Sequence, residues 1–580
     1  MEYKDINAPI QKKPDVPETD SKIQTLKKLF NSAKLARSVY DKDWNKRWDY
    51  YKGRQTVGGR PYINLIRSTI QTMLPLLTDA KPGLNVAPTE PTDYAFSKTL
   101  QKLIEVWWEK PEVSMQHTLV EVLMDQSIYD AGILKVYYDP KAEHEMGDIR
   151  VKSVSPKNIY VNKEAIDFDK NCHTVIEVQR QTVSWLKTTF PEYSMYIKAD
   201  TEDKTKNTDE EKSQYPVNEK QAISGMSPIL NEGDCRETAE VWEIWIDSDE
   251  LTEYEETNED GTVTKGSKFK YPNGKLITML PQQNLILQEV ENPYKHGKKP
   301  YVRFIDALLP QSFWGEGEAE TLIGAQNNTN LVLGNILAYT KLMANPVWIL
   351  DGDSGVEPED ITNDFALVLK TKDGGMNKVK RDIPPALQAG ITSLYDMCLR
   401  NAEIESGIND STQGRRPTGI TAASAIESLQ EAAQTRIRLK ERNMQTSLVK
   451  LGSMLIELFM QFYSSPRVTK ITGPDGKDQW FEFYFSNENE GINLNKKEYN
   501  YIPEEDKYVG GDYTSTPSKG LFDVKILAGT SMPSQRIQRS NIAMQLRTMG
   551  VISDEELLNV LEWPISAERL QRKEEINKQV

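Results

Sequence analysis

Cysteine, histidine and long apolar runs are scarce or missing in this 580-residue chain, and each shortage narrows the choice of function. The three cysteines, Cys172, Cys235 and Cys398, form no CxxC pair, so neither a disulfide framework nor a zinc ribbon is expected. The four histidines stand outside any HExxH motif or triad-like context, which gives catalysis little support. No run of about 18 apolar residues occurs, so no transmembrane helix is expected.

An excess of basic residues is also missing. The chain carries 86 Asp and Glu against 71 Lys and Arg, which gives a formal net charge of -15. Because a sequence-specific reader of duplex DNA usually presents a basic face, this balance argues against that class of protein. It does not argue against a surface past which DNA must slide without sticking, since few phosphate contacts mean weak binding.

Motifs for bound cofactors are incomplete. The sequence GEG at 315–317 lacks the GK[ST] ending of a phosphate loop, and DGDSG at 351–355 has Thr362 where a calcium loop needs an acid. No cofactor and no metal are therefore predicted. The first residues, MEYKDINAPIQKKPD, have no apolar core, so no signal peptide is expected and synthesis in a reducing cytoplasm is favoured.

A long amphipathic stretch, residues 421–464, is the strongest pattern that the chain does contain. Its apolar residues recur three and four positions apart, which predicts one helix of roughly 60 Å. They are Ile426, Leu429, Ala433, Ile437, Met444, Leu448, Leu451, Leu455, Leu458 and Phe462. The plain interpretation is a core helix. The basic, glycine-containing loop before it carries Gln413, Arg415 and Arg416 and would suit contact with a polyanion.

Two further predicted helices, residues 317–344 and 385–406, flank a short β insertion at 345–384. They are expected to return antiparallel, as a stalk with a charged knob at its tip. The charges of the insertion are separated along the sequence. Its acidic residues are Asp351, Asp353, Glu357, Glu359, Asp360 and Asp364, and its basic residues are Lys370, Lys372, Lys378, Lys380 and Arg381.

The rest of the chain predicts a mixed α/β, helix-rich protein with more than one structural region. Helices are expected at 23–53, 61–78 (which Pro75 should bend or shorten), 94–109, 114–132, 184–190, 534–549 and from 553. Strands are expected at 133–138, 148–154, 175–179, 238–246, 347–350, 365–370, 479–485 and 521–527. Asp260-Gly261 and Asn273-Gly274 are hairpin signals. The polar residues 199–237 are expected to form a surface excursion.

Seven stretches of the chain carry a family likeness. They are DYYKGRQ (49–55), SVSPKNIYVN (153–162), ENPYKHGKKPYV (291–302), FWGEGEAETLIGAQNNTN (313–330), SGIND (406–410), TGITAASAI (418–426) and FDVKILAGTSMPSQR (522–536). Each pattern is soft on its own. In their order and spacing, from about residue 25 to about residue 570, they resemble portal proteins of tailed double-stranded DNA bacteriophages, most of all those of short-tailed phages.

The resemblance implies a portal fold with wing, stem, clip and crown regions, assembled as a ring of typically twelve subunits around a DNA channel. It divides this chain into a flexible N-terminal arm (1–22), a wing (23–316, with a polar excursion near 199–237), a first stem helix (317–344), a clip (345–384), a second stem helix (385–406), a tunnel loop (407–420), a long wing helix with the strands after it (421–533) and a crown (534–580). The chain is expected to end before the helical barrel that some relatives carry.

A mechanical function follows from the resemblance, without enzymatic activity. The ring would be the conduit for packaging and ejection of viral double-stranded DNA, which passes non-specifically. Its further partners would be the terminase, the major capsid and scaffold proteins, and the head-completion adaptor and tail proteins, with no membrane involved. The expected location is the portal vertex of the virion, after synthesis in the cytoplasm of a bacterial host.

Two groups of residues receive roles from this interpretation. Gln413, Arg415 and Arg416 would face DNA as a collar that meets phosphates without reading bases, the alternative being a solvated basic loop. The acidic and basic halves of the clip would pair across subunits or contact terminase, the alternative being two solvated charge runs. Two other classes stay open, a DNA-processing enzyme such as a nuclease and a structural connector without a DNA channel.

Overall fold

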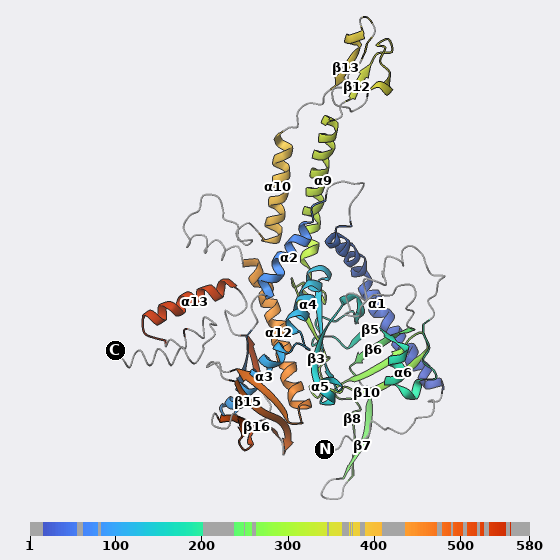
Figure 1. Ribbon diagram of the computed structural model, residues 1–580. Coiled ribbons are helices and arrows are strands. Elements are labelled where there is room, and N and C mark those ends of the chain that lie inside the picture. The colour runs from blue at the N-terminus through green and yellow to red at the C-terminus, as the bar shows by residue number, and fades with distance from the viewer. Residues whose placement is uncertain are drawn as a thin grey trace. The chain divides into compact units, whose positions relative to one another are not determined.

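The computed structural model describes a large part of the chain, which falls into two compact units (Figure 1). The described residues are 16–54, 62–78, 83–200, 237–248, 250–257, 263–344, 347–361, 370–371, 373, 375–382, 389–408, 435–472, 478–488, 491–502, 507–518, 522–526, 533–552 and 557. The first unit takes Met1–Lys46, Met73–Gly317 and Thr435–Val580, and the second takes Arg47–Thr72 and Glu318–Gln434. Helices α1 (Val16–Lys52) and α2 (Leu65–Thr78) contribute residues to both.

The first unit mixes helices with several antiparallel sheets. Its further helices are α3 (Tyr94–Glu109), α4 (Met115–Tyr129), α5 (Ala142–Glu145), α6 (Val183–Thr189), α12 (Thr435–Phe462) and α13 (Pro533–Thr548). Its strands as far as residue 305 are β1 (Leu84–Pro88), β2 (Ala131–Asp139), β3 (Asp148–Val154), β4 (Ile159–Val161), β5 (Thr174–Thr182), β6 (Thr238–Ile246), β7 (Leu251–Thr257), β8 (Val263–Phe269), β9 (Lys275–Leu280), β10 (Leu285–Glu291) and β11 (Tyr301–Ile305). The later strands are β14 (Arg467–Thr472), β15 (Asp478–Glu488), β16 (Gly491–Ile502), β17 (Lys507–Gly510), β18 (Thr514–Ser518) and β19 (Phe522–Ile526).

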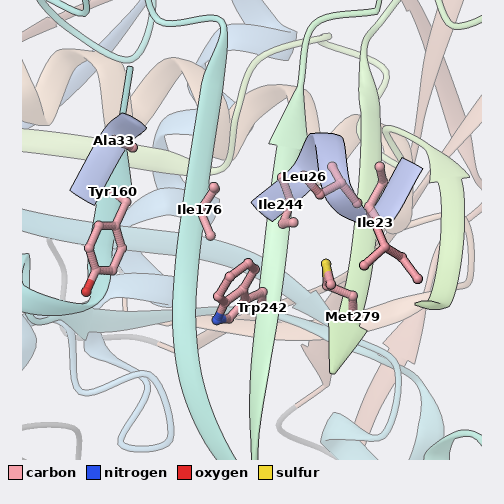
Figure 2. Packing of buried hydrophobic residues seen from close by; sticks show 9 residues of the cluster. Ile23, Leu26, Ala33, Tyr160, Ile176, Trp242, Ile244 and Met279 are labelled. Carbon is pink, nitrogen blue, oxygen red and sulfur yellow. The ribbon is translucent and has the colours of Figure 1, made fainter. Parts of the chain in front are cut away.

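The N-terminal half of α1 packs against the five-stranded sheet β10-β9-β6-β5-β4 (Figure 2). Ile23, Leu26, Phe30 and Ala33 recur three and four positions apart, so they share one face of the helix. They meet apolar side chains from four strands, among them Tyr160, Ile176, Trp242, Ile244 and Met279. Phe30 stacks on Trp242 with ring centroids 4.0 Å apart. Trp242 and Trp245, like Trp107 and Trp108, are buried.

A buried ion network joins this sheet to the three-stranded sheet β11-β2-β3. Lys135 of β2 lies 2.7 Å from Glu177 of β5 and 2.5 Å from Glu243 of β6. Glu177 also accepts hydrogen bonds from Lys152 at 2.9 Å and from the Tyr301 hydroxyl at 2.7 Å. Burial alone would raise the pKa of Glu177, but the two lysines outweigh it and hold that pKa at about 2.

Helix α12 packs on β11 and on β19. Lys440 lies 2.5 Å from Asp306, directly after β11. Gly452 stands where a Cβ would meet the Val524 side chain of β19 at 2.8 Å, so the close approach of helix and strand requires a glycine. β19 in turn pairs antiparallel with β1, and β14-β15-β16-β17 form another sheet, in which β18 also pairs with β16.

The second unit contains α9 (Glu318–Ala344) and α10 (Ala389–Ser406), which pack side by side (Figure 1). Between them along the chain, β12 (Val347–Leu350) pairs antiparallel with β13 (Val379–Asp382). Figure 1 draws this hairpin beyond the ends of the two helices. Gly407, with φ +71°, ends α10, and its N–H donates to the Glu403 carbonyl at 2.9 Å. The predicted helix pair with a β insertion is therefore present.

Two local predictions are wrong. Helix α2 begins at Leu65 rather than at residue 61 and continues through Pro75 to Thr78, so Pro75 does not shorten it. Asn273-Gly274 does not close a hairpin, because β8 pairs with β7 whereas β9 pairs with β6 and β10. The turn instead carries the chain from one sheet to another, and Gly274 supplies the φ of +78° that this change of direction needs.

Several other predictions fall outside the described residues. These are most of the polar excursion at 199–237, the strand at 365–370, the loop from 409 to 420, the first part of the long helix at 421–434 and nearly all of the helix expected from 553. Within the described part of the long helix, Thr435–Phe462, the predicted helical structure is confirmed.

Replacing Lys135 tests the buried ion network. Lys135→Met leaves the charge of Glu177 buried with less compensation, so the free energy of unfolding should fall by about 3–5 kcal/mol in urea denaturation. Because the folded pKa of Glu177 is depressed to about 2 from 4.5, the network's contribution is present above about pH 4.5 and is lost as the pH falls toward 2.

Lys141→Met, at an exposed lysine just after the same strand, is the matched control and should change little. Equal unfolding free energies for the Lys135→Met and Lys141→Met variants would show that the network contributes nothing to stability.

Candidate functional site

The middle of α9 presents amide side chains to the start of α2. Gln326 Oε1 accepts the backbone N–H of Ile66 at 3.0 Å, and Gln326 Nε2 donates to the Tyr62 hydroxyl. Asn330 accepts the N–H of Ile63 at 2.9 Å and donates to the carbonyl of the same residue at 3.2 Å. These bonds satisfy backbone groups that the beginning of a helix leaves without intrahelical partners.

Two more contacts extend this amide cluster, which we define as Gln326, Asn327 and Asn330. Asn327 accepts a hydrogen bond from the Tyr50 hydroxyl at 2.9 Å, and Glu320 pairs with Arg47 at 2.6 Å. Burial, reinforced by Tyr50, raises the pKa of Tyr62 to about 12, so its hydroxyl stays protonated and donates to the Tyr50 carbonyl at 3.0 Å. The cluster therefore positions helices and carries no group arranged for bond making.

Close packing explains the glycines at 315–317 that precede α9. Gly315 has φ +74°, and a Cβ there would meet the Ala307 carbonyl oxygen at 2.7 Å. The N–H of Gly317 donates to the buried Asp130 carboxylate at 2.8 Å, and a Cβ there would meet the Ser127 carbonyl oxygen at 2.8 Å. This segment lies tightly against the end of α4, so it is not an open loop that cradles a phosphate.

The acidic residues of the charged insertion between 351 and 360 are exposed, and two of them shape its backbone. The Asp351 carboxylate accepts the N–H of Asp353 at 3.2 Å, and the Asp360 carboxylate accepts the N–H of Glu357 at 3.1 Å. Glu357 and Glu359 are exposed in the same short segment. The sequence that hinted at a calcium loop is therefore a hydrogen-bonded turn, closed by Ser354 N–H donating to the Asp351 carbonyl at 2.9 Å.

One basic residue of the insertion meets its acidic half within the chain. Lys378 Nζ lies 3.5 Å from Asp353 Oδ2, and the Lys378 carbonyl accepts the N–H of Asp351 at 3.0 Å. The Asp353 side chain is well exposed and that of Lys378 is partly exposed, so this ion pair contributes little stability. Lys370 and Lys380 are exposed as well. The acidic and basic halves of the insertion thus meet at Asp353 and Lys378 within one subunit. For the other charged residues of the insertion, pairing across subunits stays a prediction.

The remaining predicted site residues are only partly placed. Arg381 lies opposite Trp348 in the β12–β13 ladder. Lys372 and the three loop residues Gln413, Arg415 and Arg416 lie outside the described residues.

Sequence reasoning missed the amide cluster, although a signal for it was present. GAQNNTN, at 324–330, places four amides in the middle of a helix that carries no charge from residue 321 to residue 340. Amides in such a position need hydrogen-bond partners, because burying them without partners costs free energy.

Over the residues that the structure describes, no group of three or more His, Cys, Asp and Glu side chains could hold a metal ion. None of the helices within the same part of the chain is both long and apolar enough to span a bilayer.

The contacts described above hold helices and hairpins in place. A scan against protein-family models matches residues 89–476, well over half of the chain, to the family described as phage SU10 portal protein. The chain belongs to this family of phage portal proteins, whose members are structural components of the virion. A search of curated proteins finds no match to the chain.

Gln326→Met tests the amide cluster. The substitution keeps the side-chain volume but leaves the Ile66 N–H and the Tyr62 hydroxyl each short of a partner. The free energy of unfolding should fall by about 1–3 kcal/mol. Lys341→Ala, at an exposed position of the same helix, is the control and should stay within about 0.5 kcal/mol of the parent chain. A Gln326→Met variant as stable as the control would contradict the assigned role.

Proposed function

We propose that this protein assembles into a ring, of twelve subunits, whose channel carries viral double-stranded DNA into the capsid and out again. Membership of the phage portal family is the observation that carries the proposal. The family match spans α9, the β12–β13 hairpin and α10, the elements that the proposal treats as stem and clip.

The proposed division of labour follows the sequence. Residues 317–344 and 385–406 form the stem, 345–384 the clip, 407–420 the tunnel loop, 421–533 the long wing helix and following strands, and 534–580 the crown, while 23–316 form the wing. The exposed charges of the clip dock the terminase during packaging and later the head-completion and tail proteins. Support for a docking role comes from the exposure of Glu357, Glu359, Lys370 and Lys380.

Weak contact with DNA is the physical requirement of such a channel. Each phosphate that a lysine or arginine neutralises adds affinity through counterion release, and many such contacts would stop the DNA from sliding. A chain of formal charge -15 that offers a few cations per subunit meets this requirement. Arg415 and Arg416 supply those cations, and together with Gln413 they form a collar that contacts the phosphate backbone without reading bases.

The double variant Arg415→Ala and Arg416→Ala tests the collar. Rings should still assemble, while packaging or retention of DNA changes, because the collar touches DNA rather than neighbouring subunits. Nuclease protection of packaged DNA measures the effect, and Lys28→Ala with Lys34→Ala, at two exposed lysines of α1, is the control. Packaging and retention equal to those of the parent protein would reject the collar.

Electron microscopy of the purified chain tests the ring, and rings with an axial hole are expected. Glu357→Lys with Glu359→Lys should lower the fraction of subunits in rings, because like charges would then face each other across subunits. Adding Lys370→Glu and Lys380→Glu to the same chain should restore ring formation by exchanging the two signs.

Other results of the electron microscopy would support the alternative functions. Particles without an axial hole would favour a connector without a channel, and monomers with nuclease activity would favour a DNA-processing enzyme. Rings that form equally well with and without the charge reversal would remove the clip from the subunit contact and leave the channel proposal intact.

A further inference from the structure

The solvent side of α1 carries an apolar pair followed by two lysines. These positions, which we call the α1 row, are Ser32, Leu35, Val39, Lys42 and Lys46, and all five are exposed. Steps of three and four residues keep them on one side of the helix, over roughly 20 Å. Leu35 is 74% exposed and Val39 is 71% exposed. A helix side that stays in water normally carries charged and polar residues, so the apolar pair is not what a solvent-facing surface needs.

Val39 is unfavourable at its position in the single chain. A β-branched side chain loses rotamer freedom in a helix, so valine has a lower helix propensity than lysine or glutamate. Burial of the side chain would offset that cost, but Val39 is exposed. The neighbours Ser32 and Ser38 are short, and the Ser38 hydroxyl donates to the Leu35 carbonyl at 2.7 Å, so neither serine covers the apolar pair. A surface that covers the pair has to come from outside the described residues.

The opposite side of α1 is firmly held. Arg37 is buried, and its guanidinium donates to the carbonyls of Lys157 at 2.6 Å and Ile159 at 3.0 Å. One turn further on, the buried Trp44 donates its indole N–H to the Asp130 carboxylate at 3.0 Å. The α1 row therefore lies on a helix whose position is fixed before any partner arrives, which lowers the entropic cost of binding.

The charge of the row is opposite in sign to that of the whole chain. The chain has a formal net charge of -15, whereas the row carries two lysines and no acid, the exposed Asp43 lying beside it. Neither Lys42 nor Lys46 forms an ion pair with a carboxylate of the described residues, and Asp41 is engaged by Arg37 at 3.0 Å. Cations without a partner next to an apolar pair are complementary to a surface that combines carboxylates with aliphatic side chains.

We propose that the α1 row binds an acidic amphipathic helix of another protein. Steps of three and four residues are the spacing with which two helices interlock their side chains, so a helix suits the row better than an extended peptide. The partner helix covers Leu35 and Val39 with an aliphatic pair of its own. Its Asp or Glu residues, one or two turns further along, meet Lys42 and Lys46. The inference goes beyond the proposed channel, and it does not depend on the ring.

Charge and polarity disfavour two other occupants. A second copy that offered the same row would set Lys42 and Lys46 against lysines, because a two-fold contact pairs like surfaces. DNA phosphates would attract the two lysines, but they offer no apolar surface to Leu35 and Val39. An acidic helix satisfies both halves of the row.

Photo-cross-linking of the full chain identifies what covers the row. The amino acid p-benzoylphenylalanine replaces Leu35 or Val39 in cells in which the virus assembles, and mass spectrometry sequences the cross-linked peptide. We expect a peptide of another protein that carries two aliphatic residues three or four positions apart and at least two Asp or Glu within the next two turns. The same probe at Thr188, an exposed position of α6, is the control and should not yield that peptide.

Charge reversal tests the basic end of the row. Lys42→Glu with Lys46→Glu, in the chain that carries the probe at position 39, should lower the yield of the cross-link at least tenfold, because like charges would then face each other. Lys187→Glu with Lys198→Glu makes the same change of charge at exposed lysines away from the row and should leave the yield unchanged. All four lysines are exposed, so both variants should fold like the parent chain.

Every other result overturns the inference. A cross-linked peptide from this chain would mean that the row is covered by its own chain or by a second copy, and a product that a nuclease shortens would mean that DNA covers it. A peptide of another protein without acidic residues, no cross-link at either position, or an unchanged yield after charge reversal would also contradict the proposal. Ring formation by the same variants is read separately by electron microscopy, so the proposed function stands or fails independently of the cross-linking.

Discussion

Helix α9 depends on neighbouring segments for its stability because most of its length lacks charged residues, and much of the second unit follows from that constraint. No charged residue occurs from residue 321 to residue 340. One part of the helix surface is hydrogen-bonded through Gln326 and Asn330 to the start of α2, and another packs on α10. An isolated helix of this composition would present apolar and amide groups to water over its whole circumference. Its stability therefore comes from neighbours rather than from solvation.

Patterns with a strong period and a local cause were predictable from the sequence. The apolar repeats of α3 and α9 predict both helices, with ends within a residue or two of those observed, because the helical period extends over the whole of each segment. The charged strand β13 was missed, since VKRD shows neither alternation nor apolar character. β13 is a strand because it pairs with β12, and the sequence of β13 alone does not indicate that pairing.

The candidate site was predictable in outline and not in its contacts. Separated charges in the insertion were visible, whereas the use of Asp351 and Asp360 to shape turns was not, because such bonds depend on backbone geometry. The glycines at 315 and 317 resembled part of a phosphate-loop motif. They are required instead because the carbonyl oxygens of Ala307 and Ser127, from segments distant in the sequence, leave no room for a Cβ. A sequence pattern does not identify the atoms that pack against its residues in the folded chain.

The pairing of β1 with β19 bears on how the protein is made. Leu84–Pro88 leaves the ribosome early, whereas its partner strand, Phe522–Ile526, follows ~430 residues later. At about 5–20 residues per second, translation of the intervening segment takes roughly 20–90 s, during which β1 has no strand to pair with. A nascent or prematurely terminated polypeptide therefore lacks this pair. The first unit is completed only in chains synthesised past Ile526, so the fold itself discriminates finished subunits from fragments.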